Sequence, residues 1–410
     1  MERETMTRHT RITAAAAALA GISLLATACA STAGEAAPED AAAAEVTATT
    51  SPEAATGRVA VAYENGIAVL DPETLEVVAE FDSEEFTRLN PFGDGRTVAV
   101  TTSSGFQVLD TAEPALTDLV FDATTPGHVV MHHGKTVLFD DGTGTTTILD
   151  TDVFADGYGA LPEGETYTAE AAHHGVSIVL EDGTLLTTVG DETGRTGAVA
   201  LHAHDDHWDE AASSAQCPGI HGEGTAQDEA VVFGCEDGAL LYQDGAFTKL
   251  TAPDAYGRMG NAFVSDTSPI VVGDYKNDPD AEGYLLNAVT LIDTAAATYE
   301  VVDLPDEVQY TFRDVARGPG DLAYILATDG QIHVLDPETG ELTDAFPVVE
   351  AWEGPAEWQD AHPAIKVDGD IAYVTEPAAN TVHAVDLTTG ETVASVELDH
   401  TPNELAVALD

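Results

Sequence analysis

The strongest structural signal in the sequence lies in residues 362–396, HPAIKVDGDIAYVTEPAANTVHAVDLTTGETVASV. Four short runs within it, 362–367, 371–375, 381–386 and 391–396, are rich in β-branched or aromatic residues, and Gly, Asp, Asn or Pro residues separate them. Runs of this length and composition, bounded by turn-forming residues, are typical of β-strands. The stretch therefore predicts a four-stranded antiparallel meander.

The third run of this meander recurs along the chain about every 40 residues, the period expected of propeller blades. Each copy alternates apolar residues and ends in Asp before a turn, which suits a half-buried strand whose terminal carboxylate caps that turn. The clear copies are 67–71 (IAVLD), 106–110 (FQVLD), 147–150 (TILD), 289–293 (VTLID) and 332–336 (IHVLD). Weaker copies follow Gly183 and Gly238. The repeat predicts an all-β fold, a single β-propeller of eight four-stranded blades, or of seven if residues 185–216 do not form a full sheet.

The two ends of the repeat predict how the ring closes. The first unit begins at its second strand, residues 58–62, with no inner strand before it. The C-terminus adds a lone strand at residues 404–409. This strand can complete the first blade and cover a sheet edge that an open ring would expose.

The charge of the chain restricts its partners. Of the 410 residues, 73 are Asp or Glu and 14 are Lys or Arg, so the formal net charge is -59. Such a field repels nucleic-acid phosphates and anionic lipid headgroups, which excludes nucleic-acid binding and electrostatic membrane docking. Hydrophobic residues make up 44% of the chain, enough for a buried core rather than a disordered acidic tail.

The N-terminal segment predicts export. In residues 1–28, three Arg precede an apolar run that is too short to span a bilayer, as in a secretory signal. Residues 26–29, ATAC, resemble the lipobox of bacterial lipoproteins, which implies that a lipidated Cys29 anchors the protein to the outer face of the cytoplasmic membrane. The alternative is an ordinary signal peptide cleaved near Ala30. Residues 29–56, rich in Ala, Glu, Thr and Pro, predict a flexible linker before a propeller domain at 57–410.

Two cysteines remain for the folded domain. Cys217 and Cys235 belong to a chain that we expect to be exported, flank a stretch of ordinary loop length and have no other partner. A cysteine-based metal site would need more sulfur ligands nearby. The sequence therefore predicts a disulfide between Cys217 and Cys235.

Catalytic motifs do not stand out in the sequence. It contains no nucleophile elbow, phosphate-cradling glycine loop, dinucleotide-binding fingerprint or HExxH pattern. Dipeptides such as Asp141-Gly142 are predicted to be hairpin turns. We therefore predict that the protein is not an enzyme.

The histidines give a more specific signal of function, because several fall at equivalent positions in different blades. His128, His221 and His362 each lie near the start of the innermost strand of a predicted blade. Because inner strands line the channel of a propeller, side chains from different blades can converge on one ion. Three neutral imidazoles suit Zn2+, with a fourth position for water or for a carboxylate such as Glu223 or Glu170. The alternative for each histidine alone is a hydrogen-bonded turn residue.

Two histidine pairs have matching surroundings. His173 and His174 precede Gly175 just as His132 and His133 precede Gly134. The alignment places both pairs at the far end of an inner strand, where they could form a cluster at the other channel mouth or cap a hairpin. His173 and His174 are included among the candidate zinc ligands, without a choice between the two rings.

A second candidate metal site lies in residues 202–210, HAHDDHWDE. His202 and His204 share one face of an extended segment, and His207 with acidic residues such as Asp206 can fold back around an ion. Short His-rich tracts of this kind bind metal loosely. The alternative is a polar surface loop.

Several of these segments together resemble the AztD-type zinc metallochaperones over about residues 57–410. The most specific part is residues 217–223, CPGIHGE, with the partner cysteine in 233–235, FGC; residues 126–130, PGHVV, and 172–176, AHHGV, add to it. Residues 372–375 are also similar to the YVTN class of propellers. The resemblance implies an exported propeller that carries Zn2+ and passes it to the substrate-binding protein of a zinc ABC importer.

The resemblance has one departure, and two other functions compete with it. Gram-negative members tend to carry a His-rich segment at the mature N-terminus, whereas residues 31–56 contain no His. Either the 202–207 loop takes that role, or transfer works differently. The alternatives are a non-catalytic interaction scaffold and a quinoprotein- or lyase-like propeller enzyme, which would want cationic and aromatic partners around a quinone cofactor. We expect a monomer that meets the membrane only through its lipid anchor.

Overall fold

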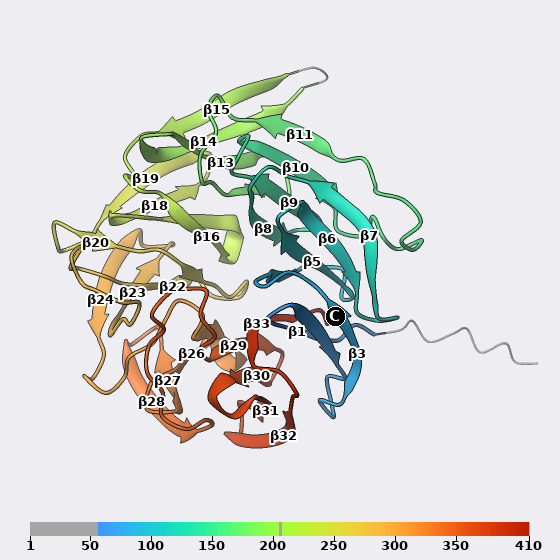
Figure 1. Cartoon of the computed structure of the whole chain (residues 1–410). Helices are drawn as coiled ribbons and strands as arrows, with labels where there is room; N and C mark the ends of the chain where they lie inside the picture. The colour runs from blue at the N-terminus through green and yellow to red at the C-terminus, as the bar shows by residue number, and fades with distance from the viewer. Residues whose placement is uncertain (1–55, 205–206, 410) are drawn as a thin grey trace, which may run out of the picture. The chain divides into compact units, whose positions relative to one another are not determined.

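The computed structural model describes residues 56–204 and 207–409, which all lie in the compact unit Pro52–Asp410. The strands of this unit form eight four-stranded antiparallel sheets that follow one another around a ring (Figure 1). Seven are built on four consecutive strands, and the first combines β1, β2 and β3 with the C-terminal β33. This architecture confirms the predicted all-β, eight-bladed propeller. The signal, linker and Cys29 predictions fall on residues 1–56, which lie outside the described part except for residue 56.

Each blade contributes one strand to each of four concentric positions, from the channel outward. The inner strands are β33 (Pro402–Val407), β4 (Arg88–Pro91), β8 (Pro126–His132), β12 (Ser177–Val179), β16 (His221–Ala226), β21 (Ala262–Phe263), β25 (Val315–Arg317) and β29 (Ala364–Asp368). The second strands are β1 (Val59–Tyr63), β5 (Thr97–Thr102), β9 (Lys135–Asp140), β13 (Leu185–Asp191), β17 (Ala230–Cys235), β22 (Ile270–Asp274), β26 (Ala323–Leu326) and β30 (Ile371–Glu376).

The third strands are β2 (Gly66–Leu70), β6 (Gly105–Asp110), β10 (Thr145–Asp150), β14 (Gly194–Ala203), β18 (Asp237–Gln243), β23 (Ala288–Asp293), β27 (Gln331–Asp336) and β31 (Thr381–Asp386). The outer strands are β3 (Val77–Asp82), β7 (Ala115–Asp122), β11 (Glu165–Thr168), β15 (Trp208–Ser214), β19 (Ala246–Thr251), β24 (Thr298–Asp303), β28 (Glu341–Pro347) and β32 (Glu391–Glu397). A short extra strand, β20 (Gly257–Arg258), pairs with β18.

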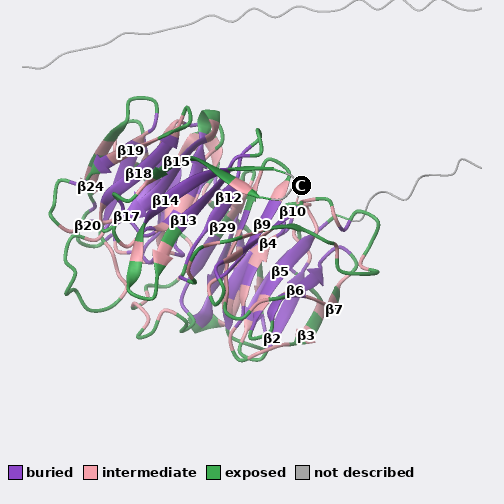
Figure 2. Ribbon diagram, turned by 90° about the horizontal axis from the view of Figure 1, so that it is seen from above, coloured by how far each residue is buried: buried purple, intermediate pink, exposed green. Residues whose placement is uncertain are grey.

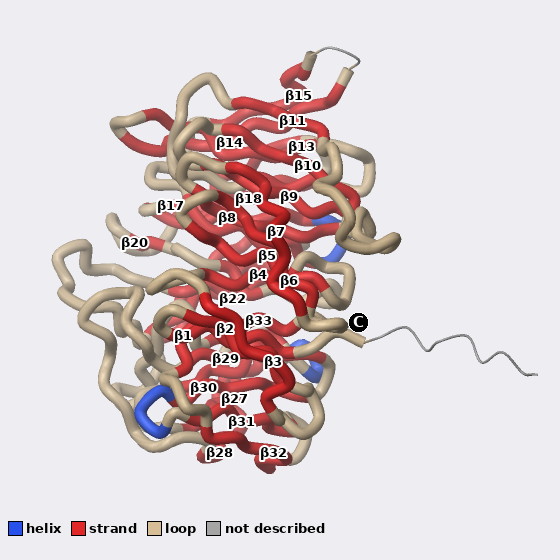
Figure 3. Tube along the Cα trace, turned by 45° about the vertical axis from the view of Figure 1, so that its right-hand side comes forward, coloured by secondary structure: helices blue, strands red, loops and turns tan. Residues whose placement is uncertain are grey.

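Helical structure is minor in the described residues. It consists of three 3-10 turns, η1 (Gln227–Glu229), η2 (Pro319–Asp321) and η3 (Pro377–Ala379). None of the described helices has the length and apolar character needed to cross a membrane. The strands run through the middle of the ring and the loops gather at its two faces, where side chains can form sites (Figure 3).

Burial follows the position of a strand within its blade (Figure 2). The central strands β1 and β2 are buried almost throughout, whereas the outer strands β28 and β32 are mostly exposed. Each blade packs both of its faces against neighbouring blades, so the apolar core is divided into layers between the sheets. One such layer joins Val61 and Leu405 of the first blade to Tyr373 and Val382 of the last.

The acidic residue after the third strand caps the following turn, as the repeat predicts. Asp71 Oδ1 accepts hydrogen bonds from the backbone N–H groups of Glu73 and Thr74, and Asp386 Oδ1 accepts them from Thr388 and Thr389. These bonds stabilise the charged carboxylate and lower the pKa of Asp71 and of Asp386.

The closure of the ring and the number of blades are both confirmed. The C-terminal strand β33 pairs with β1, with Val407 opposite Val59 and Ala406 opposite Ala60, and thereby supplies the inner strand of the first blade. The irregular stretch 185–216 contains β13, β14 and β15, which with the short β12 make a complete sheet. Because this sheet is complete, the propeller has eight blades and not seven.

The predicted disulfide between Cys217 and Cys235 is also present. Cys217 lies in the segment that leads into β16, and Cys235 is the last residue of β17. Both residues are fully buried. The bond therefore fixes the approach to the inner strand that begins with His221.

Candidate metal centre

Three histidines from three consecutive blades meet at one mouth of the channel. His128 is the third residue of β8, His174 precedes β12, and His221 is the first residue of β16. One ligand nitrogen from each ring lies within 4.8 Å of the other two. The inner strands all begin at this end of the channel, which we call the strand-start mouth; β8 and β16 border the middle of the ring in Figure 1.

Two of these rings are oriented by hydrogen bonds at their Nδ1 atoms. His221 Nδ1 lies 2.6 Å from the carbonyl oxygen of Gly260, and His174 Nδ1 lies 2.5 Å from Asp141 Oδ2. Both partners are acceptors, so each Nδ1 carries a proton, and Nε2 is the atom that each ring has left to bind a metal ion. Metal-binding histidines in proteins are commonly held in this way, because the second bond fixes both tautomer and orientation.

Glycines beside two of the histidines make room for these partners. A Cβ atom at Gly127 would lie 2.3 Å from Asp141 Oδ1, and a Cβ atom at Gly222 would lie 2.3 Å from the carbonyl oxygen of Gly260. Gly222 also has a φ of 56°, in the left-handed region that favours glycine. The sequences Gly127-His128 and His221-Gly222 therefore serve the geometry of the site as well as its donor set.

The electrostatic environment keeps the two inner rings neutral. Burial lowers the pKa of His128 well below its usual range and lowers the pKa of His221 to about 3. The neutral imidazole is the form that binds a metal ion, so these two ligands need not lose a proton on binding at neutral pH.

The spacing of the donor atoms suits an ion of the size of zinc. His174 Nε2 and His221 Nε2 are 3.0 Å apart. Two nitrogen ligands of a tetrahedral zinc ion, each about 2.0–2.1 Å from the metal, lie roughly 3.3 Å apart. A shift of a few tenths of an ångström in the exposed ring of His174 would bring these two nitrogens to that separation.

The carboxylates that we predicted as a fourth ligand occupy different environments. Glu223 lies on β16 two residues after His221, and burial raises its pKa to about 7. Its side chain has no hydrogen-bond partner among the described residues, and it is not part of the three-histidine group. Glu170 is exposed in the segment between β11 and β12.

His362 does not share the site with His128 and His221, contrary to the grouping that its strand position predicts. Its Nε2 accepts a hydrogen bond from Arg313 Nε at 3.0 Å, and its Nδ1 lies 2.7 Å from the carbonyl oxygen of Asp360. Burial, assisted by the charge of Arg313, lowers the pKa of His362 to about 4. Both ring nitrogens are occupied, and the adjacent guanidinium would repel a metal cation.

The neighbouring pair His173 and His174 divides between two roles. His173 is buried, with its Nδ1 2.9 Å from the carbonyl oxygen of Ala171 and its Nε2 3.0 Å from Thr188 Oγ1. The ring is therefore held by the protein on both sides. His174 is the member of the pair that reaches the metal centre.

The predicted alignment of the two His-His-Gly segments is wrong. His132 and His133 lie at the end of β8 and in the turn that follows it, whereas His173 and His174 come before β12. The difference arises because β12 is only three residues long and its hairpin turn is formed later, around Asp182-Gly183. The two segments therefore lie at opposite mouths of the channel.

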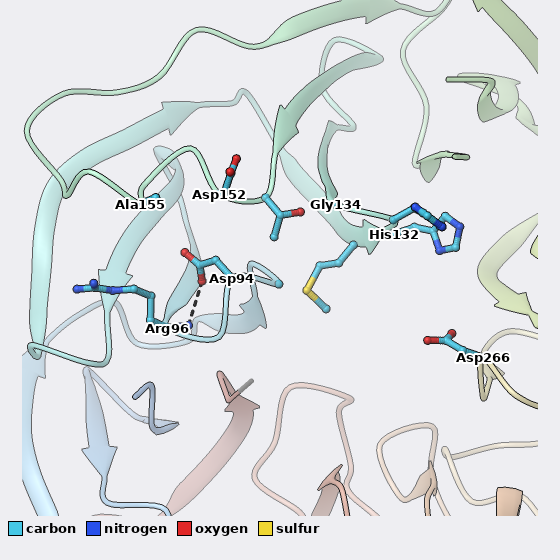
Figure 4. Close-up of a pocket in the computed structure, with 11 residues that line it drawn as sticks. Asp94, Arg96, His132, Gly134, Asp152, Ala155 and Asp266 are labelled. Atoms are coloured by element: carbon cyan, nitrogen blue, oxygen red, sulfur yellow. Dashed lines mark hydrogen bonds between the residues drawn. The ribbon is translucent and has the colours of Figure 1, made fainter. Parts of the chain in front are cut away.

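The strand-end mouth, where the inner strands end, contains a pocket of about 520 Å³ lined by His132, His133, Asp94 and Asp266 among others (Figure 4). His132 Nε2 lies 2.8 Å from Glu229 Oε1, and His133 Nε2 lies 3.6 Å from Glu181 Oε2. These histidines thus pair with acidic side chains of neighbouring turns.

The His-rich segment forms part of the β14–β15 connection. His204 Nε2 lies 3.2 Å and His207 Nε2 lies 3.4 Å from the carboxylate of Asp209, and the two rings stack. His202, at position nine of the ten-residue strand β14, is exposed. Asp206 lies outside the described residues. Among the described residues, the segment does not bring three potential ligands together.

Sequence reasoning missed three residues that contact the histidines of the strand-start mouth: Asp141, Gly260 and Arg313. Asp141 was expected only in a hairpin turn, and 33 residues separate it from His174. Arg313 lies 49 residues from His362. The local signals of a close approach at the site were the glycines next to His128 and His221, Gly127 and Gly222.

The fold and the site define the chain as an eight-bladed β-propeller with a three-histidine candidate metal centre at one mouth of its channel. No protein-family model matches it. A curated protein that it resembles is the zinc chaperone AztD of Citrobacter koseri, with 22% identity over 299 residues, covering 72% of this chain and 68% of that protein. The resemblance to AztD-type proteins predicted from the sequence is therefore confirmed.

Solved structures share the fold. The apo AztD structure from Citrobacter koseri superimposes with a TM-score of 0.68 at 20% identity, covering 85% of this chain and 96% of that one. The dihydro-heme d1 dehydrogenase NirN superimposes with a TM-score of 0.60 at 13% identity, covering 86% of this chain and 75% of that one. At these identities the likeness concerns the propeller architecture.

Proposed function

We propose that the protein is an exported zinc chaperone that binds Zn2+ through His128, His174 and His221 and passes it to the substrate-binding protein of a zinc ABC importer. The observation that carries this proposal is the convergence of three imidazole donors, two of them with Nδ1 bound to acceptors. The likeness to a protein named zinc chaperone AztD supports the same metal.

The graded exposure of the site provides a route for transfer. The side chain of His174 is 44% exposed, whereas His128 and His221 are more deeply placed. A ligand from the recipient can therefore replace His174 first, while the two inner histidines hold the ion. Exchange of one ligand at a time avoids release of free zinc. In this scheme the protein binds and releases a cargo and needs no catalytic group.

The negative charge of the chain assists capture without selecting the metal. With a formal net charge of -59, the protein raises the local concentration of any cation. Selection rests on the number and geometry of the imidazoles, and Cu2+ would normally bind such a set more tightly than Zn2+. Zinc delivery therefore depends also on which metal is available outside the cell.

Metal analysis tests the zinc site. Purified protein loaded with zinc and dialysed should retain about one tightly bound ion. The His174→Ala variant should lose this ion, while His400→Ala, a substitution of an exposed histidine stacked on Tyr63, should retain it. Equal zinc in the parent and in His174→Ala would contradict the site.

A transfer assay tests the handover separately. Zinc-loaded protein is mixed with the metal-free substrate-binding protein and a chelator that captures free zinc. Direct transfer predicts that the recipient gains zinc faster than the chelator alone removes it from the chaperone. Identical rates would leave a zinc-binding scaffold rather than a chaperone.

The anchoring proposal has its own test. We propose that residues 1–28 are removed and that Cys29 is lipidated, with residues 29–56 as the linker. Metabolic labelling with a fatty acid should label the parent, and Cys29→Ala should abolish the label and release the protein from the membrane fraction. An unlabelled parent would favour cleavage near Ala30.

A further inference from the structure

The strand-start mouth also carries positive charge, on blades other than those of the three histidines. Arg88 is the first residue of β4, Arg313 lies shortly before β25, and Lys366 is the third residue of β29. They come from the second, seventh and eighth blades, whereas the three histidines come from the third, fourth and fifth. Three of the 14 Lys and Arg residues of a very acidic chain therefore gather at one end of the channel.

The carboxylate at this cluster is Glu404 of β33. Glu404 Oε1 lies 3.0 Å from Arg313 Nη1 and 3.8 Å from Arg88 Nε, and it is the one acid within ion-pair distance of the three cations among the described residues. Asp314 lies next to Arg313, but burial raises its pKa to about 7, so it offsets only part of the charge. The cluster keeps an excess of positive charge.

Each guanidinium nitrogen of Arg313 forms at least one hydrogen bond, so this side chain is held in place. Its Nε donates to His362 Nε2 at 3.0 Å, its Nη1 donates to Asn403 Oδ1 at 2.8 Å and to Glu404, and its Nη2 donates to the carbonyl oxygen of Asp360 at 3.3 Å. His362 thus has the role of positioning Arg313.

Arg88 and Lys366, in contrast, have side-chain N–H groups that form no hydrogen bond with the described residues. Arg88 Nε is buried and has no hydrogen-bond partner, and none of the guanidinium nitrogens has an acceptor among the described residues. The guanidinium lies over the ring of Trp358 at 5.8 Å. Lys366 forms no hydrogen bond or ion pair within the described part of the chain, and its side chain is exposed, so its ammonium group can meet a ligand. It interacts electrostatically with Glu404, Arg88 and Arg313, which places it in the same cluster.

Arg88 Nε is shielded from solvent without a hydrogen-bond acceptor, which costs free energy, and an anion that accepts from it would remove that cost. Guanidinium and ammonium groups both pair well with the oxygens of carboxylates and phosphates. The surface of a protein with 73 acidic residues repels such anions elsewhere.

We propose that Arg88 and Lys366, with Arg313 held behind them by His362 and Glu404, bind a small oxyanion at the strand-start mouth. The ligand is a carboxylate or an inorganic phosphate, which share the oxygen acceptors that these donors require. The site stands on its own geometry and does not depend on zinc binding.

Calorimetric titration of metal-free protein tests the site. Succinate and inorganic phosphate are titrated separately at pH 7, with the ionic strength held constant by sodium chloride, so that general salt effects on an acidic protein cancel. The proposal predicts saturable binding of at least one of them at one site. Succinate alone, phosphate alone or both would each support the oxyanion site and identify the preferred class. Absence of saturable binding of both would overturn it.

Matched variants assign the binding to these residues. Arg88→Gln and Lys366→Met should each weaken the binding about tenfold or more. Lys135→Met removes an exposed lysine that pairs with Asp150 on another blade, and it should bind like the parent. Circular dichroism and zinc content, measured in parallel, verify that the variants are folded. Unchanged affinity in both folded variants would refute the assignment.

Discussion

The most exposed member of the candidate metal centre, His174, is oriented by a neighbouring carboxylate. His174 lies outside a strand and is held by Asp141, whose other oxygen accepts from the N–H group of Gly175. Asp141 can approach because Gly127 has no side chain. The position of His174 in the candidate metal centre is therefore set by residues outside the three-histidine group.

Substitution of Gly127 tests this support. In Gly127→Ala, the new methyl group would meet Asp141 Oδ1 at 2.3 Å and displace the carboxylate from His174. Loss of such an outer partner typically weakens metal binding 10–100-fold. Competition with a chelator should show this loss in zinc affinity, whereas Gly159→Ala, where a Cβ atom meets nothing within 4 Å, should match the parent. Parent-like affinity in Gly127→Ala would mean that Asp141 does not position His174.

Asp314 predicts a pH dependence of stability. Burial raises the pKa of its carboxyl group to about 7, whereas in the unfolded chain it titrates near 3.8, so the folded state binds more protons between these values. Asp314 therefore makes the parent less stable as pH rises from about 4 to 8, by at most about 4 kcal/mol. Asp314→Asn should lack this contribution.

Urea unfolding from pH 4.5 to 8 measures the difference. The free energy of unfolding of Asp314→Asn, relative to that of the parent, should increase with pH. Asp306→Asn, at an exposed position, should keep the pH dependence of the parent. A constant difference between Asp314→Asn and the parent would show that the carboxyl group is already ionised in the folded state.

At the scale of single elements, strands with strong local patterns were predictable and those without were not. The third strands alternate apolar residues and end in a capping Asp, so six of them, with the 381–386 run included, could be located directly from the sequence. The inner strands β12 and β21 have three and two residues, too few for any periodicity. This is why His174 was placed at the wrong end of its strand.

The disulfide positions His221, because it joins the segment that enters β16 to the end of β17. Cys217 and Cys235 are separated by 18 residues, and closing a loop of this size stabilises a fold by about 3 kcal/mol. The double variant Cys217→Ala, Cys235→Ala should lose about this much in urea unfolding and should bind zinc more weakly, because the segment entering β16 is released. In a reductant, the parent should approach the variant. Equal stability of parent and variant without reductant would contradict this role.

At the scale of the whole propeller, the sequence predicts the ring and its closure, because both depend on repeated local patterns. It does not predict which histidines face each other. That choice depends on contacts between residues far apart in sequence. Strand position alone would assign His362 to the zinc site, but its Nε2 accepts a hydrogen bond from Arg313. The chemistry of the candidate metal centre and the grouping of His128 with His221 were therefore predictable. His174 was among the predicted ligands but was assigned to the other mouth of the channel.

Closure of the ring can be measured with one pair of substitutions. Leu405 of β33 is 1% exposed and packs between the first and last blades, so Leu405→Ala should cost about 2–5 kcal/mol. Leu161→Ala, at a position that is 39% exposed, should change the unfolding free energy by less than about 0.5 kcal/mol. Similar effects of the two variants would show that β33 contributes little to the stability of the ring.

The pairing of β33 with β1 also determines when folding can finish. The two strands stand at opposite ends of the domain, so the first blade stays incomplete until the last few residues have left the ribosome. For a protein threaded through a translocon as an extended polypeptide, such a delay is useful. If the protein is exported as we propose, the chain can cross the membrane before β33 closes the ring.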